Sequence, residues 1–217
     1  MQLSRPLLLG LGAALLGAAA LWLRPKTYKR ILLVGDSQLD GSYTLGGRLA
    51  ELLRKRGFTV QLLARYGKGA ATGGSYFLAE RLPSALKSFK PDLVVVSLGG
   101  NDASRHHPSS KRAAYQKIIR AWAKLIQASG ADLIWFTPST ADNRAYEAKR
   151  QKIREHLRSA LEPMGVTVYD HSDLTRDIPR RKLSSTGAAD GVHFNRPEYE
   201  RWAKRVNEGP LASLRLG

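Results

Sequence analysis

The sequence predicts a single α/β domain built on a mostly parallel, doubly wound sheet. Three observations indicate this fold: five short apolar runs are spaced along the chain, amphipathic helical stretches separate them, and glycine-containing turns follow several of the runs. Strands that are apolar throughout are typical of a sheet that helices cover on both faces. With 217 residues, 43% of them apolar and 24% charged, the chain suits one well-buried globular domain.

The first half of the pattern begins with a strand, helix, strand unit. Residues 31–34 form a short apolar run that suits a strand buried on both faces, and residues 45–53 place their leucines on one helical face. A second strand is expected at 59–63. The glycine-rich stretch 67–74 then precedes another amphipathic helix, at 82–89.

The second half continues the alternation. Residues 92–98, with the sequence DLVVVSL, are the clearest buried strand in the chain, and two glycines follow them. Helices around 115–126 and 153–161 alternate with strands at 133–136 and 166–169. In a sheet of this kind the carboxyl ends of the strands meet at one edge, where we expect the active site.

An apolar segment precedes the pattern. Residues 6–23 read PLLLGLGAALLGAAALWL, carry no charge and are near the minimum length of a membrane-spanning helix. Trp22 and the cations that follow it resemble an interfacial anchor. We therefore expect residues 1–30 to be a hydrophobic anchor with a basic flank, bound to a membrane through residues 6–23, and residues 31–217 to form the folded domain. A cleaved secretory signal is the alternative.

The chain is strongly basic, with a formal net charge of +17. The first thirty residues hold five Lys or Arg and no acid, so the remaining 30 cations and 18 acids leave +12 on the rest of the chain. Such a charge favours an anionic partner, either phospholipid headgroups, an acidic polymer or nucleic acid. The aromatic residues fall mostly on apolar helix or strand positions, which argues against nucleic acid. Without cysteine, thiolate chemistry and disulfides are excluded.

Three short motifs lie at the ends of these predicted elements. GDS at 35–37 follows the first strand, and GGND at 99–102 follows the strand at 92–98. DGVH at 190–193 comes shortly before Pro197, which suits the first turn of a closing helix. Each motif alone occurs by chance, whereas the three in this order indicate one site.

The motifs hold the groups that a serine nucleophile needs. A serine hydroxyl at its free pKa is a poor nucleophile, so a base must take its proton, and that base needs an acceptor to fix its tautomer. Ser37, His193 and Asp190 supply these three roles. The Asn101 amide can donate to a developing oxyanion. Asp102 better suits a turn-stabilising or helix-capping carboxylate.

In identity, order and spacing the three motifs resemble the SGNH (GDSL-like) hydrolase family, over nearly all of residues 31–207. The resemblance implies a three-layer flavodoxin-like domain with about five parallel strands. It also implies hydrolysis, or transfer, of ester-linked acyl groups without a metal or organic cofactor. In that family's scheme Ser37 is the nucleophile, His193 the base and Asp190 the group that orients it.

The resemblance also implies an oxyanion hole. Its donors would be the backbone N–H of Ser37, the side-chain amide of Asn101 and a backbone N–H from the glycine block after the second strand. The family often shows an Asn before a Gly in that block, whereas this chain reads RYGKG at 65–69. Gly67 is the preferred donor, and Gly69 stays the alternative.

These observations predict a serine-dependent acyl or acetyl esterase acting on acylated cell-surface glycan or peptidoglycan. Four cations follow the apolar segment, and the positive-inside tendency would hold the domain in the cytoplasm. The expected substrates favour the extracytoplasmic side, which we adopt. The alternatives are a lysophospholipase or thioesterase on lipid acyl esters, an O-acyltransferase, and a non-catalytic basic binding module. Arg105, His106, His107 and Lys111 are candidates to bind an anionic part of the substrate, and the oligomeric state stays open.

Overall fold

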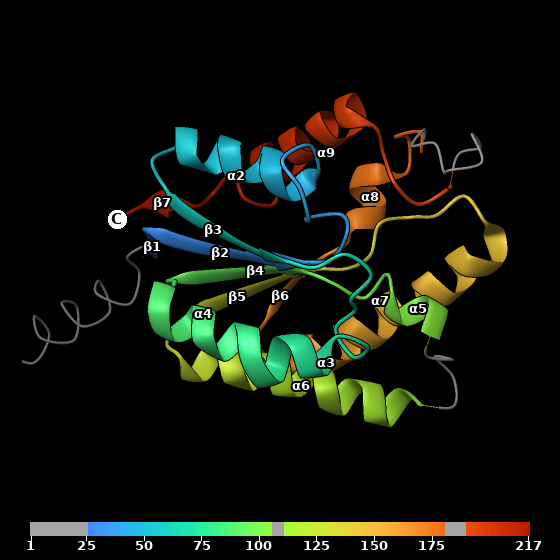
Figure 1. Cartoon of the computed structure of the whole chain (residues 1–217), viewed down its shortest axis with the longest axis horizontal. Helices are drawn as coiled ribbons and strands as arrows, with labels where there is room; N and C mark the ends of the chain where they lie inside the picture. Colours follow the sequence, from blue (N-terminus) through green and yellow to red (C-terminus); the bar gives the residue numbers. More distant parts are fainter. Residues whose placement is uncertain (1–25, 106–110, 181–189) are drawn as a thin grey trace, which may run out of the picture.

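A computed structural model describes residues 26–105, 111–180 and 190–217, and its centre is one parallel sheet between two layers of helices (Figure 1). The strands of this sheet are β2 (Arg30–Gly35), β3 (Thr59–Ala64), β4 (Leu93–Ser97), β5 (Asp132–Phe136) and β6 (Thr167–Tyr169). They lie in the order β3-β2-β4-β5-β6, and every neighbouring pair is parallel. The predicted doubly wound α/β fold is therefore confirmed.

Helices cover both faces of the sheet. One face carries α2 (Leu45–Lys55), α8 (His171–Thr175) and α9 (Arg196–Glu208), and the other carries α4 (Leu82–Phe89), α6 (Arg112–Ala128) and α7 (Arg144–Leu161) (Figure 1). Four short segments complete the helices of the described chain: α3 (Gly74–Tyr76), the π-helix η1 (Phe77–Arg81), α5 (Asp102–Arg105) and the 3₁₀-helix η2 (Glu162–Met164).

The uninterrupted apolar run of β2 follows from these two layers. Alternate residues of a strand point to opposite faces, so Leu32 packs into the core that contains Trp122 of α6, and Leu33 packs into the core that contains Trp202 of α9. All four side chains are fully buried. A strand with two buried faces has no place for a polar residue, which is why it reads as apolar throughout.

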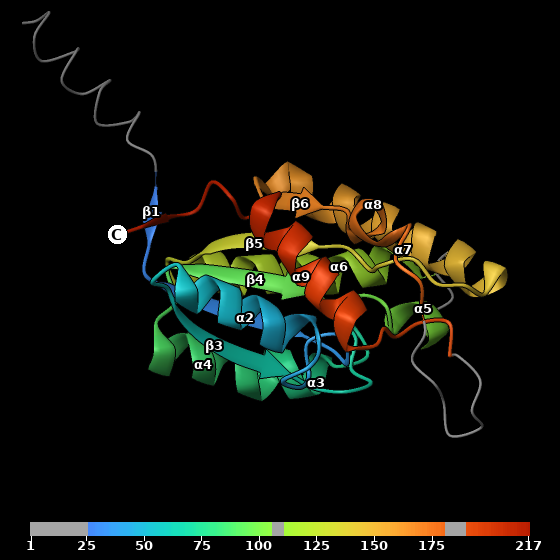
Figure 2. The same cartoon turned by 90° about the horizontal axis from the view of Figure 1, so that it is seen from above.

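A second, two-stranded sheet lies at the end of the molecule where the long strands begin (Figures 1 and 2). It pairs β1 (Thr27–Tyr28) with β7 (Arg215–Leu216) in parallel. Lys26 Nζ lies 2.7 Å from an Asp132 carboxylate oxygen, and the Tyr28 hydroxyl donates to Asp132 at 2.9 Å. Lys26 and Tyr28, which precede the predicted boundary at residue 31, thus already contact the folded domain.

The predicted membrane segment at residues 6–23 lies outside the described residues. Within the three described ranges, no helix is long and apolar enough to cross a bilayer. The anchor therefore stays a prediction.

His171, at the start of α8, is buried among aromatic rings. Its imidazole stacks on Phe136, with 4.3 Å between ring centroids, and meets the Trp202 ring edge-on at 4.7 Å. Neither ring nitrogen has a hydrogen-bond partner in the described part of the chain. Burial lowers the pKa of His171 to about 3, because a protonated ring would be an uncompensated charge in the core.

This buried imidazole predicts acid sensitivity. The unfolded chain binds the extra proton below a pKa of about 6.5, so the free energy of unfolding falls as pH drops from there towards 3. Near pH 5 the loss should be about 2 kcal/mol relative to neutral pH. His171→Phe should remove this part of the pH dependence, measured by urea unfolding near pH 7.5 and pH 5. An unchanged difference between the two pH values in the variant would contradict the assignment.

Candidate active site

Ser37 and Asn101 lie at the point where the strand order of the sheet reverses. Ser37 follows β2 and Asn101 follows β4, the strand beside β2, while β3 lies on the other side of β2. Ligands of open α/β sheets bind outside the carboxyl ends of the strands at this switch point. The loop before α9 reaches the same edge and brings His193 Nε2 to 2.7 Å from Ser37 Oγ.

Asp190 holds the other side of the His193 ring. Its Oδ2 lies 2.7 Å from His193 Nδ1, and its Oδ1 accepts the backbone N–H groups of Val192 at 2.9 Å and His193 at 2.8 Å. Burial raises the pKa of Asp190, but these hydrogen bonds outweigh burial and leave the pKa lowered. A carboxylate facing Nδ1 favours the tautomer with its hydrogen there, and Nε2 is then free to accept the Ser37 proton.

Gln38 joins the turn of Ser37 to the loop of His193. Its side-chain amide donates to the Val192 carbonyl at 3.2 Å, and its Oε1 accepts the Tyr199 hydroxyl at 2.7 Å. The Gln38 side chain is buried, so these bonds have little competition from water. The sequence gives no signal for this role, because both partners lie more than 150 residues away along the chain.

The backbone N–H groups of Ser37 and of Gly67 have no acceptor among the described residues. The N–H of Gly69 donates instead to Thr72 Oγ1 at 2.9 Å. Gly67 has the left-handed φ of 70° that favours glycine, and space surrounds it. A side chain at Gly69 would collide with the Asp102 carboxylate. This arrangement favours Gly67 over Gly69 as the oxyanion donor.

The Asn101 amide lies between the turn after β2 and the glycine block. Its Nδ2 donates to Asp36 Oδ2 at 3.1 Å and to the Lys68 carbonyl at 3.2 Å. Both amide hydrogens are engaged in the free protein. Donation to a substrate oxyanion therefore requires one of these two bonds to be exchanged, and the role of Asn101 stays a prediction.

Asp102, which follows β4, holds the glycine-rich stretch 67–74, which follows β3. Its fully buried carboxylate accepts the backbone N–H groups of Ala70 at 2.8 Å, Ala71 at 3.1 Å and Thr72 at 3.0 Å, and the Tyr115 hydroxyl at 3.2 Å. Burial raises its pKa against the effect of these bonds. The sequence predicts a local turn or capping role for Asp102, whereas its main partners lie about thirty residues earlier.

A buried cation lies beneath the GGND motif. Arg150 of α7 is 2% exposed, donates to Ser139 Oγ at 3.3 Å and lies over the Tyr146 ring, 5.5 Å from its centroid. A Cβ on Gly100 would be 3.1 Å from Arg150 Nη2 and 3.6 Å from Asp36 Oδ2, so the motif has no room for a side chain there. Burial raises the pKa of Asp36 to about 6, although the Gln38 N–H and the Arg150 charge oppose the shift.

The structure thus brings Ser37, His193 and Asp190 into one hydrogen-bonded series, with Gly67 and Asn101 in the adjoining loops. Of the residues predicted to bind an anionic part of the substrate, Lys111 is exposed. His106 and His107 lie outside the described residues.

Comparison with known proteins identifies the family of the chain. A model of the GDSL-like lipase/acylhydrolase family matches residues 33–201, a span that contains all three motifs. The uncharacterized esterase YxiM of Bacillus subtilis (strain 168) is 27% identical over 197 residues, which are 80% of this chain and 49% of that protein. The chain therefore spans about half the length of this curated relative.

Solved structures show the same fold. The acetylxylan esterase Axe2 from Geobacillus stearothermophilus has a TM-score of 0.63 at 15% identity, with 84% of this chain and 94% of that chain covered. A lipase/acylhydrolase from Enterococcus faecalis has a TM-score of 0.61 at 21% identity, with 83% and 96% covered. By its three motifs, its sheet and the match over residues 33–201, the chain belongs to the GDSL-like lipase/acylhydrolase family.

Proposed function

We propose that this chain is a serine-dependent esterase that removes acetyl or other short acyl groups from a glycan at the cell surface. The observation that carries the proposal is the hydrogen-bonded series from Ser37 through His193 to Asp190 at the carboxyl edge of the sheet. Because the series is already formed in the free protein, substrate binding does not have to assemble it.

The chemistry follows from these contacts. His193 Nε2 takes the hydroxyl proton as Ser37 Oγ attacks the carbonyl carbon of the ester. The resulting tetrahedral oxyanion accepts hydrogen bonds from the free N–H groups of Ser37 and Gly67, and from Asn101 once its amide exchanges a partner. The intermediate then collapses, and the alcohol leaves with the proton from His193. Water, activated by the same His193, hydrolyses the acyl-serine and restores the free enzyme.

We also propose that residues 6–23 hold the chain at a membrane, with the domain on the extracytoplasmic side. Lys26, the first residue that the structure describes, lies at the end of the sheet where the strands begin, whereas Ser37 follows the carboxyl end of β2. The six residues of β2 span about 20 Å. An ester in the same bilayer would lie near the starts of the strands, at the end of the domain opposite Ser37. This separation supports a polymer rather than a membrane lipid as substrate.

An exposed aromatic ring beside the site also supports a sugar substrate. Tyr66 is 67% exposed, and its ring lies nearly parallel to the His193 imidazole, at 13° and with 6.1 Å between centroids. The C–H face of a sugar ring packs well on such a surface. One structural neighbour is named for acetylxylan, an acetylated polysaccharide.

A panel of p-nitrophenyl esters of increasing acyl length tests the proposal, using the full chain in a mild detergent. We expect the acetate to be hydrolysed with the highest kcat/KM and the rate to fall with chain length. A steep rise with chain length would instead support a lysophospholipase or thioesterase. Addition of a sugar acceptor should leave free acetate as the main product; if most acetyl goes to the sugar, the chain is a transferase. No hydrolysis of any ester would support a binding module.

A further inference from the structure

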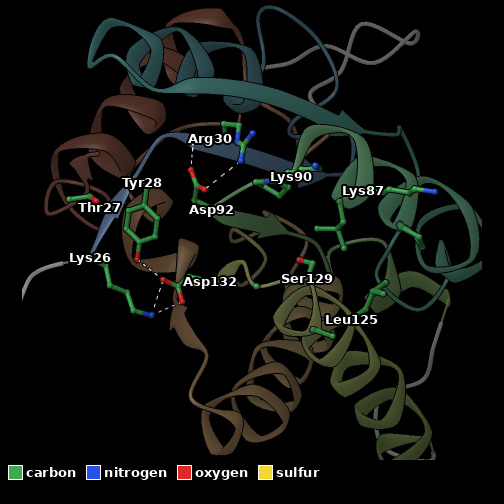
Figure 3. A pocket seen from close by; sticks show the side chains of 15 residues that line it. Lys26, Thr27, Tyr28, Arg30, Lys87, Lys90, Asp92, Leu125, Ser129 and Asp132 are labelled. Atoms are coloured by element: carbon green, nitrogen blue, oxygen red, sulfur yellow. Dashed lines mark hydrogen bonds and ion pairs between the residues drawn. The ribbon is translucent and has the colours of Figure 1, made fainter. Parts of the chain in front are cut away.

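A cavity of about 880 Å³ opens where the strands of the sheet begin, at the end opposite Ser37. Figure 3 shows the residues that line it. Its wall is formed by β1, the start of β2, the end of α4 with the turn into β4, and the end of α6. The volume falls within the range of about 300 to 1,000 Å³ that is usual for small-molecule sites. No residue of this cavity takes part in the ester chemistry described above.

The cavity has a surplus of positive charge. Figure 3 shows Lys26 beside Asp132 on one side and Lys87 on the other, with Lys90 between them. Lys26 Nζ is paired with Asp132 at 2.7 Å. Lys87 and Lys90, by contrast, have no carboxylate partner in the described ranges. The ammonium groups of Lys87 and Lys90 are thus available to bind an anion.

The second carboxylate on the wall is already engaged. Asp92 Oδ2 accepts the backbone N–H groups of Lys29 at 2.8 Å and Arg30 at 2.7 Å, and its Oδ1 lies 3.9 Å from the Arg30 guanidinium. Arg30 also lines the cavity and balances the charge of Asp92, as Lys26 balances that of Asp132. The charges of Lys87 and Lys90 therefore remain as the surplus.

Lys90 has an unusual backbone. Its φ of 50° is the one positive value among the non-glycine residues that the structure describes, and it follows directly on α4. Glycine adopts this conformation at lower cost and is the usual residue there. The fold thus holds a lysine side chain at the cavity where a glycine would suit the backbone better.

Part of the wall is apolar. Pro83 and Leu86 of α4 and Leu125 of α6 line the cavity together with the cations. A wall that carries both cations and apolar side chains matches an anionic amphiphile better than a fully hydrated ion such as free phosphate, because the apolar side chains can contact its uncharged part.

The apolar segment of the sequence ends close to this cavity. Lys26 lines the cavity, and two residues separate it from residue 23. Three residue steps reach at most about 11 Å. If residues 6–23 enter a bilayer, as proposed above, the cavity must lie at the lipid headgroups of that bilayer.

We propose that this cavity binds the anionic headgroup of a membrane phospholipid, with its phosphate held by Lys87 and Lys90. The inference rests on the proposed membrane association and is independent of the ester chemistry. A headgroup bound here, together with the membrane segment at residues 6–23, holds the starts of the strands at the membrane. Ser37, at the opposite end of the sheet, then faces away from the membrane.

The test uses the full chain in dodecyl maltoside micelles that contain equal amounts of phosphatidylglycerol and phosphatidylcholine. The protein is washed on an affinity column, and retained lipids are counted by mass spectrometry. We expect phosphatidylglycerol to be retained over phosphatidylcholine, and Lys87→Gln with Lys90→Gly to lower its retention by about tenfold. The glycine suits the backbone at position 90, so this variant should keep its fold and its ester hydrolysis.

A matched pair gives the control. Lys149→Gln with Lys152→Gln removes the same charge from exposed positions of α7 and should leave lipid retention unchanged. Equal loss in both double variants, or no preference for phosphatidylglycerol in the unaltered chain, would overturn the proposal. Displacement of the lipid by excess inorganic phosphate would assign the cavity to a soluble anion and overturn it as well. Ester hydrolysis by the same samples reports separately on the active site.

Discussion

Ser37→Ala and His193→Ala should each lower kcat for p-nitrophenyl acetate by about ten-thousandfold, and the double variant should be no slower than either single one. The two side chains perform one step, in which His193 Nε2 takes the proton that Ser37 Oγ releases over 2.7 Å. Once either group is lost, the other has nothing to act on. If the two side chains act in one step, the losses of kcat in the two single variants should therefore not multiply in the double variant.

Initial rates with purified proteins measure this effect, together with circular dichroism to show that the variants fold. Ser88→Ala is the matched control, since Ser88 is an exposed serine on α4 that donates to the Ser84 carbonyl. It should keep the full rate. Losses of the two single variants that multiply in the double variant would contradict a shared step.

Asp102→Ala should lower kcat/KM by about a hundredfold and the free energy of unfolding by about 3 kcal/mol. The substitution leaves three backbone N–H groups, at Ala70, Ala71 and Thr72, without their acceptor. The glycine block would then lose the contact that fixes it, and with it the position of the Gly67 N–H. Initial rates and urea unfolding measure the two effects.

The control for this variant is Asp173→Ala. Asp173 is an exposed carboxylate whose ion pair with Arg176 lies on the surface and should contribute little to stability. If Asp102→Ala unfolds more easily yet retains full activity while folded, Asp102 stabilises the domain without positioning the oxyanion donors.

The layers of the fold could be predicted because the information is local. Each sheet strand is a short apolar run, such as 31–34 in β2, and each long helix places its apolar residues on one face. The motifs GDS and GGND could be placed at one edge because parallel strands end together. The neighbouring positions of β2 and β4 then brought Ser37 and Asn101 close to each other.

Other features depend on partners that are distant along the chain. The contacts of Asp102 with the glycine block and of Gln38 with the loop of His193 leave no trace in the nearby sequence. In the sequence, Arg150 is one of many cations on a charged helix. Its burial beneath Gly100 is evident only in the structure. The two-residue strands β1 and β7 are too short to show any periodicity.

Covalent capture shows most directly whether Ser37 is the nucleophile that His193 activates. The full chain is treated with a fluorophosphonate ester, and the modified residue is identified by peptide mass spectrometry. We expect one label per chain, on Ser37, with much slower labelling of His193→Ala and none of Ser37→Ala. A label on another residue, or an unlabelled protein that still hydrolyses esters, would contradict it.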